Sequence, residues 1–114
     1  MADSHTAAVA SEIMKQIRWN RIVVMIGAKD PIAIKHEGKP ALRFDFKAKA
    51  KNSIKRIYIA LDEGKDLYDV YFYKKRTNRT TLETKETLVD EVEGVFFDQL
   101  IEIIEKYTGL YLYI

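Results

Sequence analysis

The sequence contains no cysteine, and this absence excludes disulfides, thiolate metal sites and cysteine nucleophiles together. It also has no run approaching the roughly 20 apolar residues that a membrane-spanning helix needs. Met1 to Thr6 lacks the basic start and apolar stretch of a secretion signal. We therefore predict an intracellular protein without a membrane partner, whose fold rests on packing alone.

The length and composition are typical of one globular domain. The chain has 114 residues, of which 47% are apolar and 32% are charged, and this is too apolar for an intrinsically disordered protein. Two separate cores would each be too small to be stable. Because residues 1–8 are small and polar, we predict a flexible N-terminus there and a single α+β domain over residues 9–114.

Charge is distributed unevenly along the chain, although the formal net charge is only +2. Residues 1–80 hold 17 basic and 9 acidic side chains, whereas residues 81–114 hold 2 basic and 8 acidic ones. The densest basic stretch runs from Lys35 to Arg56. A second basic group follows it: Lys74, Lys75, Arg76 and Arg79. Such a basic stripe is typical of a protein with a phosphate-rich partner, but it also occurs as a plain solvated surface.

Two segments have apolar residues at helical spacing. The first is Val9 to Ile17, and the second is Phe96 to Tyr107, which Gly109 would end as the residue after the helix. The segment Trp19 to Ile26 contains a continuous apolar run that fits either a buried strand or an extension of the first helix.

Period-two alternation of apolar and polar residues predicts an antiparallel meander of four to five strands between the helices. The clear strands are three segments: Ala41 to Lys47, Arg56 to Leu61 and Leu67 to Tyr73. A weaker strand is expected from about Thr80 to Val89, and a short edge strand at Pro31 to Lys35. The predicted fold class is α+β: an N-terminal helix, this meander, a C-terminal helix and a short apolar tail at Leu110 to Ile114.

Four motifs stand out together in the chain after residue 16. They are Gly27-Ala28-Lys29-Asp30, Asp66 to Phe72, Glu93 to Leu100 and Tyr107 to Leu112. As a set they resemble small, uncharacterised proteins encoded by bacteriophages and prophages. The resemblance implies an origin rather than an activity: an accessory protein of a phage or mobile element in the cytoplasm of a bacterial host cell. It implies no functional residues.

The face of the three clear strands that points away from the predicted core has the most functional content. If Phe44, Ile57 and Phe72 face a helix, the opposite face carries basic and tyrosine side chains together. Its predicted nucleic-acid-binding residues are Arg43, Lys47, Arg56, Tyr58, Tyr71 and Tyr73. Because bases stack on aromatic rings while cations contact phosphates, this face predicts a non-enzymatic protein that binds single-stranded nucleic acid.

The same pattern also fits a plain sheet surface or a protein interface, since tyrosine is a good strand residue. The alternative function is therefore a protein-interaction module, or an inhibitor of a host factor, with a host or phage protein as its partner. A homodimer also stays open. The predicted partner-binding residues lie in the apolar tail: Leu110, Tyr111 and Tyr113.

A remote alternative is a Mg²⁺-dependent nuclease built from Asp69, Glu83 and Lys85. In such a site the carboxylates would hold the metal ion and the lysine would orient the attacking water. His5 and His36 have no second histidine or suitably spaced carboxylate with which to form a metal site. The main prediction therefore includes no catalytic residues, no resident metal and no cofactor.

Overall fold

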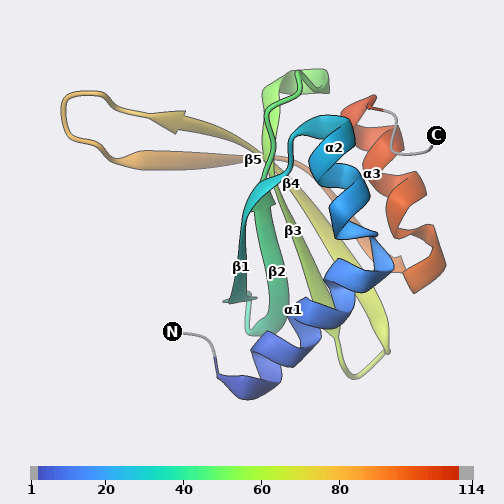
Figure 1. The fold of residues 1–114 in the computed structure, drawn as a ribbon. Helices are drawn as coiled ribbons and strands as arrows, with labels where there is room; N and C mark the ends of the chain where they lie inside the picture. The colour runs from blue at the N-terminus through green and yellow to red at the C-terminus, as the bar shows by residue number, and fades with distance from the viewer. Residues whose placement is uncertain (1–2, 111–114) are drawn as a thin grey trace.

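Helices and antiparallel strands account for most of residues 3–110, the part of the chain that the computed structural model describes (Figure 1). In chain order the elements are α1 (Ser4–Gln16), α2 (Trp19–Ile26), β1 (Lys29–His36), β2 (Lys39–Asp45), β3 (Ile54–Asp62), β4 (Leu67–Thr77), β5 (Thr84–Val95) and α3 (Leu100–Thr108). The predicted α+β class is confirmed. Among these residues no helix is long and apolar enough to cross a lipid bilayer.

The five strands form one sheet in which each strand pairs with the next one along the chain. The antiparallel meander predicted from the alternation is therefore confirmed. Alternation also determines the faces: Phe44 and Ile57 are paired neighbours on one face, and Arg43 and Tyr58 are paired neighbours on the other. The weakly predicted strand is shifted along the chain, because β5 begins at Thr84 and continues to Val95.

All three helices cover the same face of the sheet (Figure 1). The apolar side chains of β2, β3 and β4 that point toward them form the main core with residues of α1, α2 and α3. Its fully buried members include Ile13, Ile17, Leu42, Phe44, Ile57, Ile59, Val70, Phe72, Leu100 and Ile104. Each such side chain contributes roughly 2 kcal/mol through removal from water. None of the helices within residues 3–110 covers the opposite sheet face, where side chains of the strands form a second, smaller cluster.

The N-terminal helix begins earlier than predicted. It starts at Ser4 rather than at Val9, because the carboxylate of Asp3 accepts a hydrogen bond from the Thr6 N–H at 2.7 Å and caps the helix. Residues 4–8, which were predicted to be flexible, are therefore helical.

The segment that could have been a strand or a helix, Trp19–Ile26, is helix α2. Ile22 and Ile26 are four residues apart and both buried, whereas Val24 between them is 80% exposed. This spacing places one apolar face of a short helix on the core. Gly27 ends α2 with a φ of +70°, a left-handed conformation that glycine adopts without strain.

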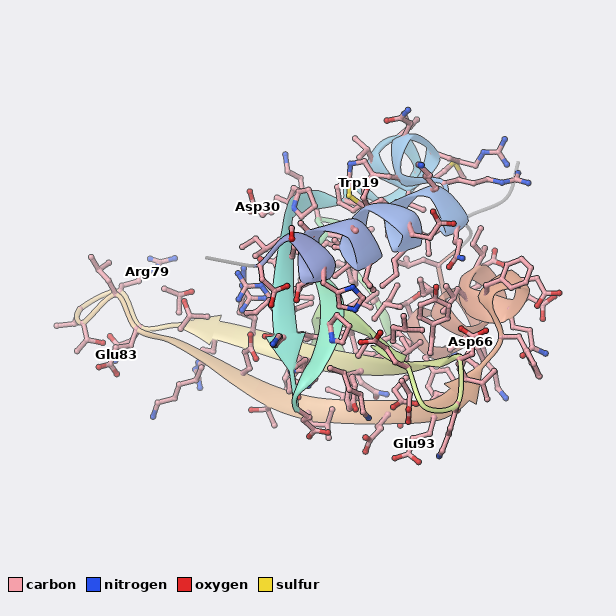
Figure 2. The ribbon with its side chains drawn as sticks, turned by 90° about the horizontal axis from the view of Figure 1, so that it is seen from below. Trp19, Asp30, Asp66, Arg79, Glu83 and Glu93 are labelled. Carbon is pink, nitrogen blue, oxygen red and sulfur yellow. The ribbon has the colours of Figure 1, made fainter. Side chains whose placement is uncertain are left out.

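The outer halves of β4 and β5 project away from the rest of the sheet as a two-stranded arm (Figures 1 and 2). The pairing of β4 with β3 ends at Lys74, whereas its pairing with β5 continues to Thr77 and Thr84. We call residues 74–87 the arm. Figure 2 labels Arg79 and Glu83 at its tip, far from Asp66 and Glu93 at the other end of the sheet.

The two-layer packing predicts different effects of truncating a buried and an exposed side chain. Ile13→Ala removes a fully buried side chain where α1 meets the sheet, and should lower the free energy of unfolding by about 3 kcal/mol. Val24→Ala, at a mostly exposed position of α2, should change it by less than about 0.5 kcal/mol. Urea unfolding followed by circular dichroism measures both. Equal effects would mean that α1 does not pack as described.

Candidate functional site

The structure brings five of the six predicted nucleic-acid-binding residues together on the sheet face opposite the helices. They are Arg43, Arg56, Tyr58, Tyr71 and Tyr73, which are neighbours in paired strands. The sixth, Lys47, follows the end of β2 and is exposed, and its backbone N–H donates to the carbonyl of Ile26. The sequence-based grouping of the five is thus reproduced in space.

Two of the three tyrosine rings of that face are nevertheless closed to a stacking base, and the third, Tyr73, is half-buried against them. Tyr58 is 5% exposed and Tyr71 is 1% exposed, and they pack with Ala41 and Ala60 in a second small apolar cluster. His36, at the end of β1, stacks on the Tyr58 ring with 4.2 Å between ring centroids. Burial lowers the pKa of His36, so this ring is neutral at pH 7. Stacking of a base on Tyr58 requires displacement of His36.

The hydroxyl groups of the buried tyrosines donate hydrogen bonds to carboxylates. The Tyr58 hydroxyl donates to Glu86 at 2.8 Å, and the Tyr71 hydroxyl donates to Glu37 at 3.1 Å. Burial raises the pKa of Tyr71 to about 12, so its hydroxyl keeps its proton at pH 7. The two carboxylates also add negative charge at this face, which repels a phosphate group.

Arg56, predicted to contact phosphate, is held in an ionic cluster of four residues around the buried carboxylate of Asp45. Its Nε donates to Oδ1 of Asp45 at 2.6 Å, and its Nη2 donates to Oδ2 at 3.2 Å. Nζ of Lys75 donates to Oδ2 of Asp45 at 2.6 Å, and Nη1 of Arg56 donates to Glu86. We call Asp45, Arg56, Lys75 and Glu86 the ionic cluster. Its contacts join β2, β3, β4 and β5.

The positive and negative charges of the ionic cluster cancel, although each of its side chains is ionised. Burial by itself raises the pKa of Asp45, but the hydrogen bonds and charges of Arg56 and Lys75 outweigh it and hold this pKa below its ordinary value of 3.8. The hydrogen bond to Asp45 raises the pKa of Arg56, which therefore stays protonated. With two cations and two carboxylates, the cluster offers no surplus positive charge to a phosphate.

A second group of cations lies on the other face of the arm. Because side chains alternate along a strand, Lys74 and Arg76 point away from the face that holds Lys75. Arg76 stands directly across from Lys85 of β5, and both line an open groove of about 580 Å³ with Lys55. We call Lys55, Lys74, Arg76 and Lys85 the basic face of the arm.

The cations of the basic face have no carboxylate partners. Within residues 3–110 no ion pair joins any of the four to an acidic side chain. Nζ of Lys55 donates instead to the backbone carbonyls of Lys47 and Ala48. Like charges directly across a pair of strands, such as Arg76 and Lys85, destabilise a sheet by up to about 1 kcal/mol. An anionic ligand in the groove would remove this repulsion.

From the sequence, Lys74 and Arg76 belong to a basic run, but no site is predicted for them. A usable signal was present, since cations at positions 74 and 76 of a strand share one face, and Lys75 lies on the other. Lys85 carries no such signal, because its place opposite Arg76 depends on the length of the hairpin loop.

The residues of the predicted nuclease site are far apart. Asp69 lies near the start of β4, where it pairs with Lys39 at 2.6 Å and accepts a hydrogen bond from the Gly94 N–H. Glu83 lies at the arm tip just before β5, about 35 Å along the strand from Gly94. The expectation that Asp69 lies beside Glu83 and Lys85 is therefore wrong. Among the described residues no three histidine or acidic side chains gather as metal ligands do.

The predicted partner-binding tail is described only at its first residue. Leu110 is half-buried and packs against the main core, so it is a structural contact rather than an open one. Tyr111 and Tyr113 lie outside the described residues. Exposed aromatic surface occurs elsewhere, at Phe96 and Phe97, which are 57% and 59% exposed between β5 and α3.

Comparison with protein-family models, with curated proteins and with solved structures finds no significant match to this chain. The resemblance to phage-encoded proteins therefore stays a prediction, and the functional argument rests on the chain's own geometry.

Removal of the buried carboxylate tests the ionic cluster. Asp45→Asn leaves Arg56 and Lys75 without their anion and should lower the free energy of unfolding by about 3 kcal/mol at pH 7. Since the pKa of Asp45 is lower in the folded chain than in the unfolded one, its contribution is complete above about pH 4 and declines as the pH falls further. The difference between wild type and Asp45→Asn should therefore shrink in acid.

The measurement is urea unfolding at neutral and acid pH, with the exposed Asp98→Asn as the matched control. The control should change the free energy of unfolding by less than about 0.5 kcal/mol. A pH-independent difference between wild type and Asp45→Asn would contradict the depressed pKa.

Proposed function

We propose that the protein binds nucleic acid, without catalysing a reaction, through the basic face of the arm. The observation that supports this most strongly is the pairing of Arg76 with Lys85 across the two strands, with Lys74 and Lys55 in the same groove and no acidic partner within residues 3–110. A row of uncompensated cations on a projecting ribbon suits a polyanion, because the cations contact successive phosphates and release bound counterions.

The proposed partner is nucleic acid, as predicted from the sequence, but the contact surface is the arm instead of the sheet face that carries the tyrosines. We call the sheet face opposite the helices the tyrosine face. Its Tyr58 and Tyr71 rings are buried, and the charge of its Arg56 is neutralised by Asp45 and Glu86. The basic face lies on the other side of the same strands, where the groove is open. Lys75 also lines this groove, but its Nζ is bound to Asp45, whereas Lys74 and Arg76 on either side of it have no ion pair within residues 3–110.

The alternative of a protein-interaction module has one supporting observation. Phe96 and Phe97 border an open groove of about 450 Å³ with Leu67 and Tyr68, at the end of the sheet away from the arm. Two half-exposed phenylalanines side by side are a usual starting point for a protein contact. This surface becomes the leading candidate if the arm proves to have no role in binding.

Charge removal on the arm tests the proposal. The triple variant Lys74→Gln, Arg76→Gln, Lys85→Gln should bind a fluorescently labelled oligonucleotide about tenfold or more weakly, because three phosphate contacts are lost. For wild type, four contacts predict a loss of affinity of about a hundredfold between about 50 and 200 mM salt. In the variant the slope of log K against log salt should become shallower by about 3. Fluorescence anisotropy measures all three quantities.

A matched control has the same change in charge elsewhere. Lys15→Gln, Arg18→Gln and Lys65→Gln remove two lysines and one arginine from exposed positions outside the arm, in α1, between α1 and α2, and in the turn between β3 and β4. This control should bind nearly as wild type does. Equal weakening by both triple variants would show attraction to net charge alone, and absence of binding by wild type at low salt would remove the proposal.

A further inference from the structure

The arm ends in an exposed leucine in an unusual backbone conformation. Leu82 is 78% exposed and has a φ of +61°, in the left-handed region that leucine rarely adopts. Both features are unfavourable for the free protein, since apolar surface stays in water and the Cβ crowds the backbone. A strained residue that the surrounding structure holds in place is a reason to look for a function.

The loop that carries Leu82 is built by hydrogen bonds around Asn78. The Leu82 N–H donates to the Asn78 carbonyl at 2.7 Å, and the Asn78 N–H donates to the Glu83 carbonyl at 2.8 Å. The Asn78 side-chain oxygen accepts from the Thr80 N–H at 2.8 Å. The hydroxyls of Thr77 and Thr84 lie 3.2 Å apart at the base of the loop. Leu82 is therefore presented outward on an ordered tip.

The arm also has the reach to enter a groove of duplex DNA. From the Lys74–Thr87 pair to the Thr77–Thr84 pair it spans three residues, or about 10 Å, before the loop begins. The major groove of B-form DNA, about 8.5 Å deep, admits a two-stranded ribbon, whereas the minor groove is only about 6 Å wide and about 7.5 Å deep. In the minor groove the hairpin tip alone would enter. With the tip in a groove, the basic face would lie at the level of the backbone phosphates.

We propose that Leu82 is a wedge that enters the minor groove of duplex DNA and separates a base step, which kinks the duplex. Minor-groove proteins use exposed apolar side chains in this way, and the unstacking is offset by the contacts that bent DNA makes with the protein. This inference rests on the proposed function and assigns its partner class. The cations near the tip, Arg76, Arg79 and Lys85, hold the flanking phosphates.

Duplex DNA suits this surface better than a single strand does. Proteins that bind single strands need aromatic platforms for the bases, and residues 74–87 contain no aromatic side chain. Of the tyrosines on the sheet beside the arm, Tyr58 and Tyr71 are buried, and Tyr73 is half-buried with its hydroxyl 3.2 Å from Nε2 of His36. An apolar aliphatic tip between cations matches a base step in a groove instead.

Energy transfer across a labelled duplex tests the wedge. A donor and an acceptor at the ends of a duplex of about 30 base pairs, with a flexible TA step at its centre, report the end-to-end distance. Wild type should raise the transfer efficiency on binding, in line with a bend of roughly 20–90°. Leu82→Ala should bind within about threefold of wild type, since phosphate contacts dominate affinity, and should lose most of the bend.

Two further variants separate the apolar side chain from the backbone conformation. Leu82→Asn removes the apolar group but tolerates the left-handed conformation, and should lose the bend as Leu82→Ala does. Leu82→Met keeps an apolar wedge and should retain it. Because Leu82 is exposed, the melting temperatures of all three variants should stay within about 3 °C of wild type. This measurement verifies that each variant is folded.

The outcomes distinguish the wedge from the proposed function. Binding of duplex without a bend, an equal bend with Leu82→Ala and Leu82→Asn, or binding of single strands alone would each overturn the wedge and leave nucleic-acid binding intact. No binding of any oligonucleotide at low salt would overturn both. Glu83→Gln adds a check on placement, because loss of the one carboxylate in residues 77–83 should tighten duplex binding severalfold if the tip contacts DNA.

Discussion

The buried carboxylate of Asp45 is the constraint on which the rest of the structure depends. A charge this far from water is tolerated only with close partners, and Asp45 has two, Arg56 from β3 and Lys75 from β4. Arg56 in turn binds Glu86, so β5 is included in the same cluster. A shift of β3 or β4 by one residue would move one of the two cations to the opposite face and leave the buried carboxylate with a single partner. The ionic cluster thus specifies the register at the base of the arm.

The same register determines which cations are available for binding. Once Lys75 points to Asp45, strand alternation directs Lys74 and Arg76 to the other face. The pairing of β4 with β5 then sets Lys85 across from Arg76, and the two like charges are left facing each other beyond the reach of the cluster. The paired cation of the ionic cluster and the cations of the proposed binding surface are therefore adjacent residues of one strand. The apolar tip at Leu82 extends this division along the arm.

The meander and both terminal helices could be predicted from local patterns, because period-two and helical spacing report burial directly. The start of α1 was placed too late because its first residues are small and polar, and the cap by Asp3 decides the boundary. The grouping of Arg56 with Tyr58 and Tyr71 on one face also followed from alternation. Their availability did not follow, since it depends on His36 from a distant strand and on carboxylates at positions 37 and 86. Tertiary contacts of this kind leave no periodic trace in a sequence.

We infer that the basic face of the arm is the surface that meets nucleic acid. Amide hydrogen exchange with and without a saturating duplex tests this most directly, because it reports contact residue by residue without altering the chain. We expect slower exchange across residues 74–87 and around Lys55, with β2 and the rest of β3 unchanged. Slower exchange confined to the strands of the tyrosine face, or to the region of Phe96 and Phe97, with the arm unaffected, would contradict it.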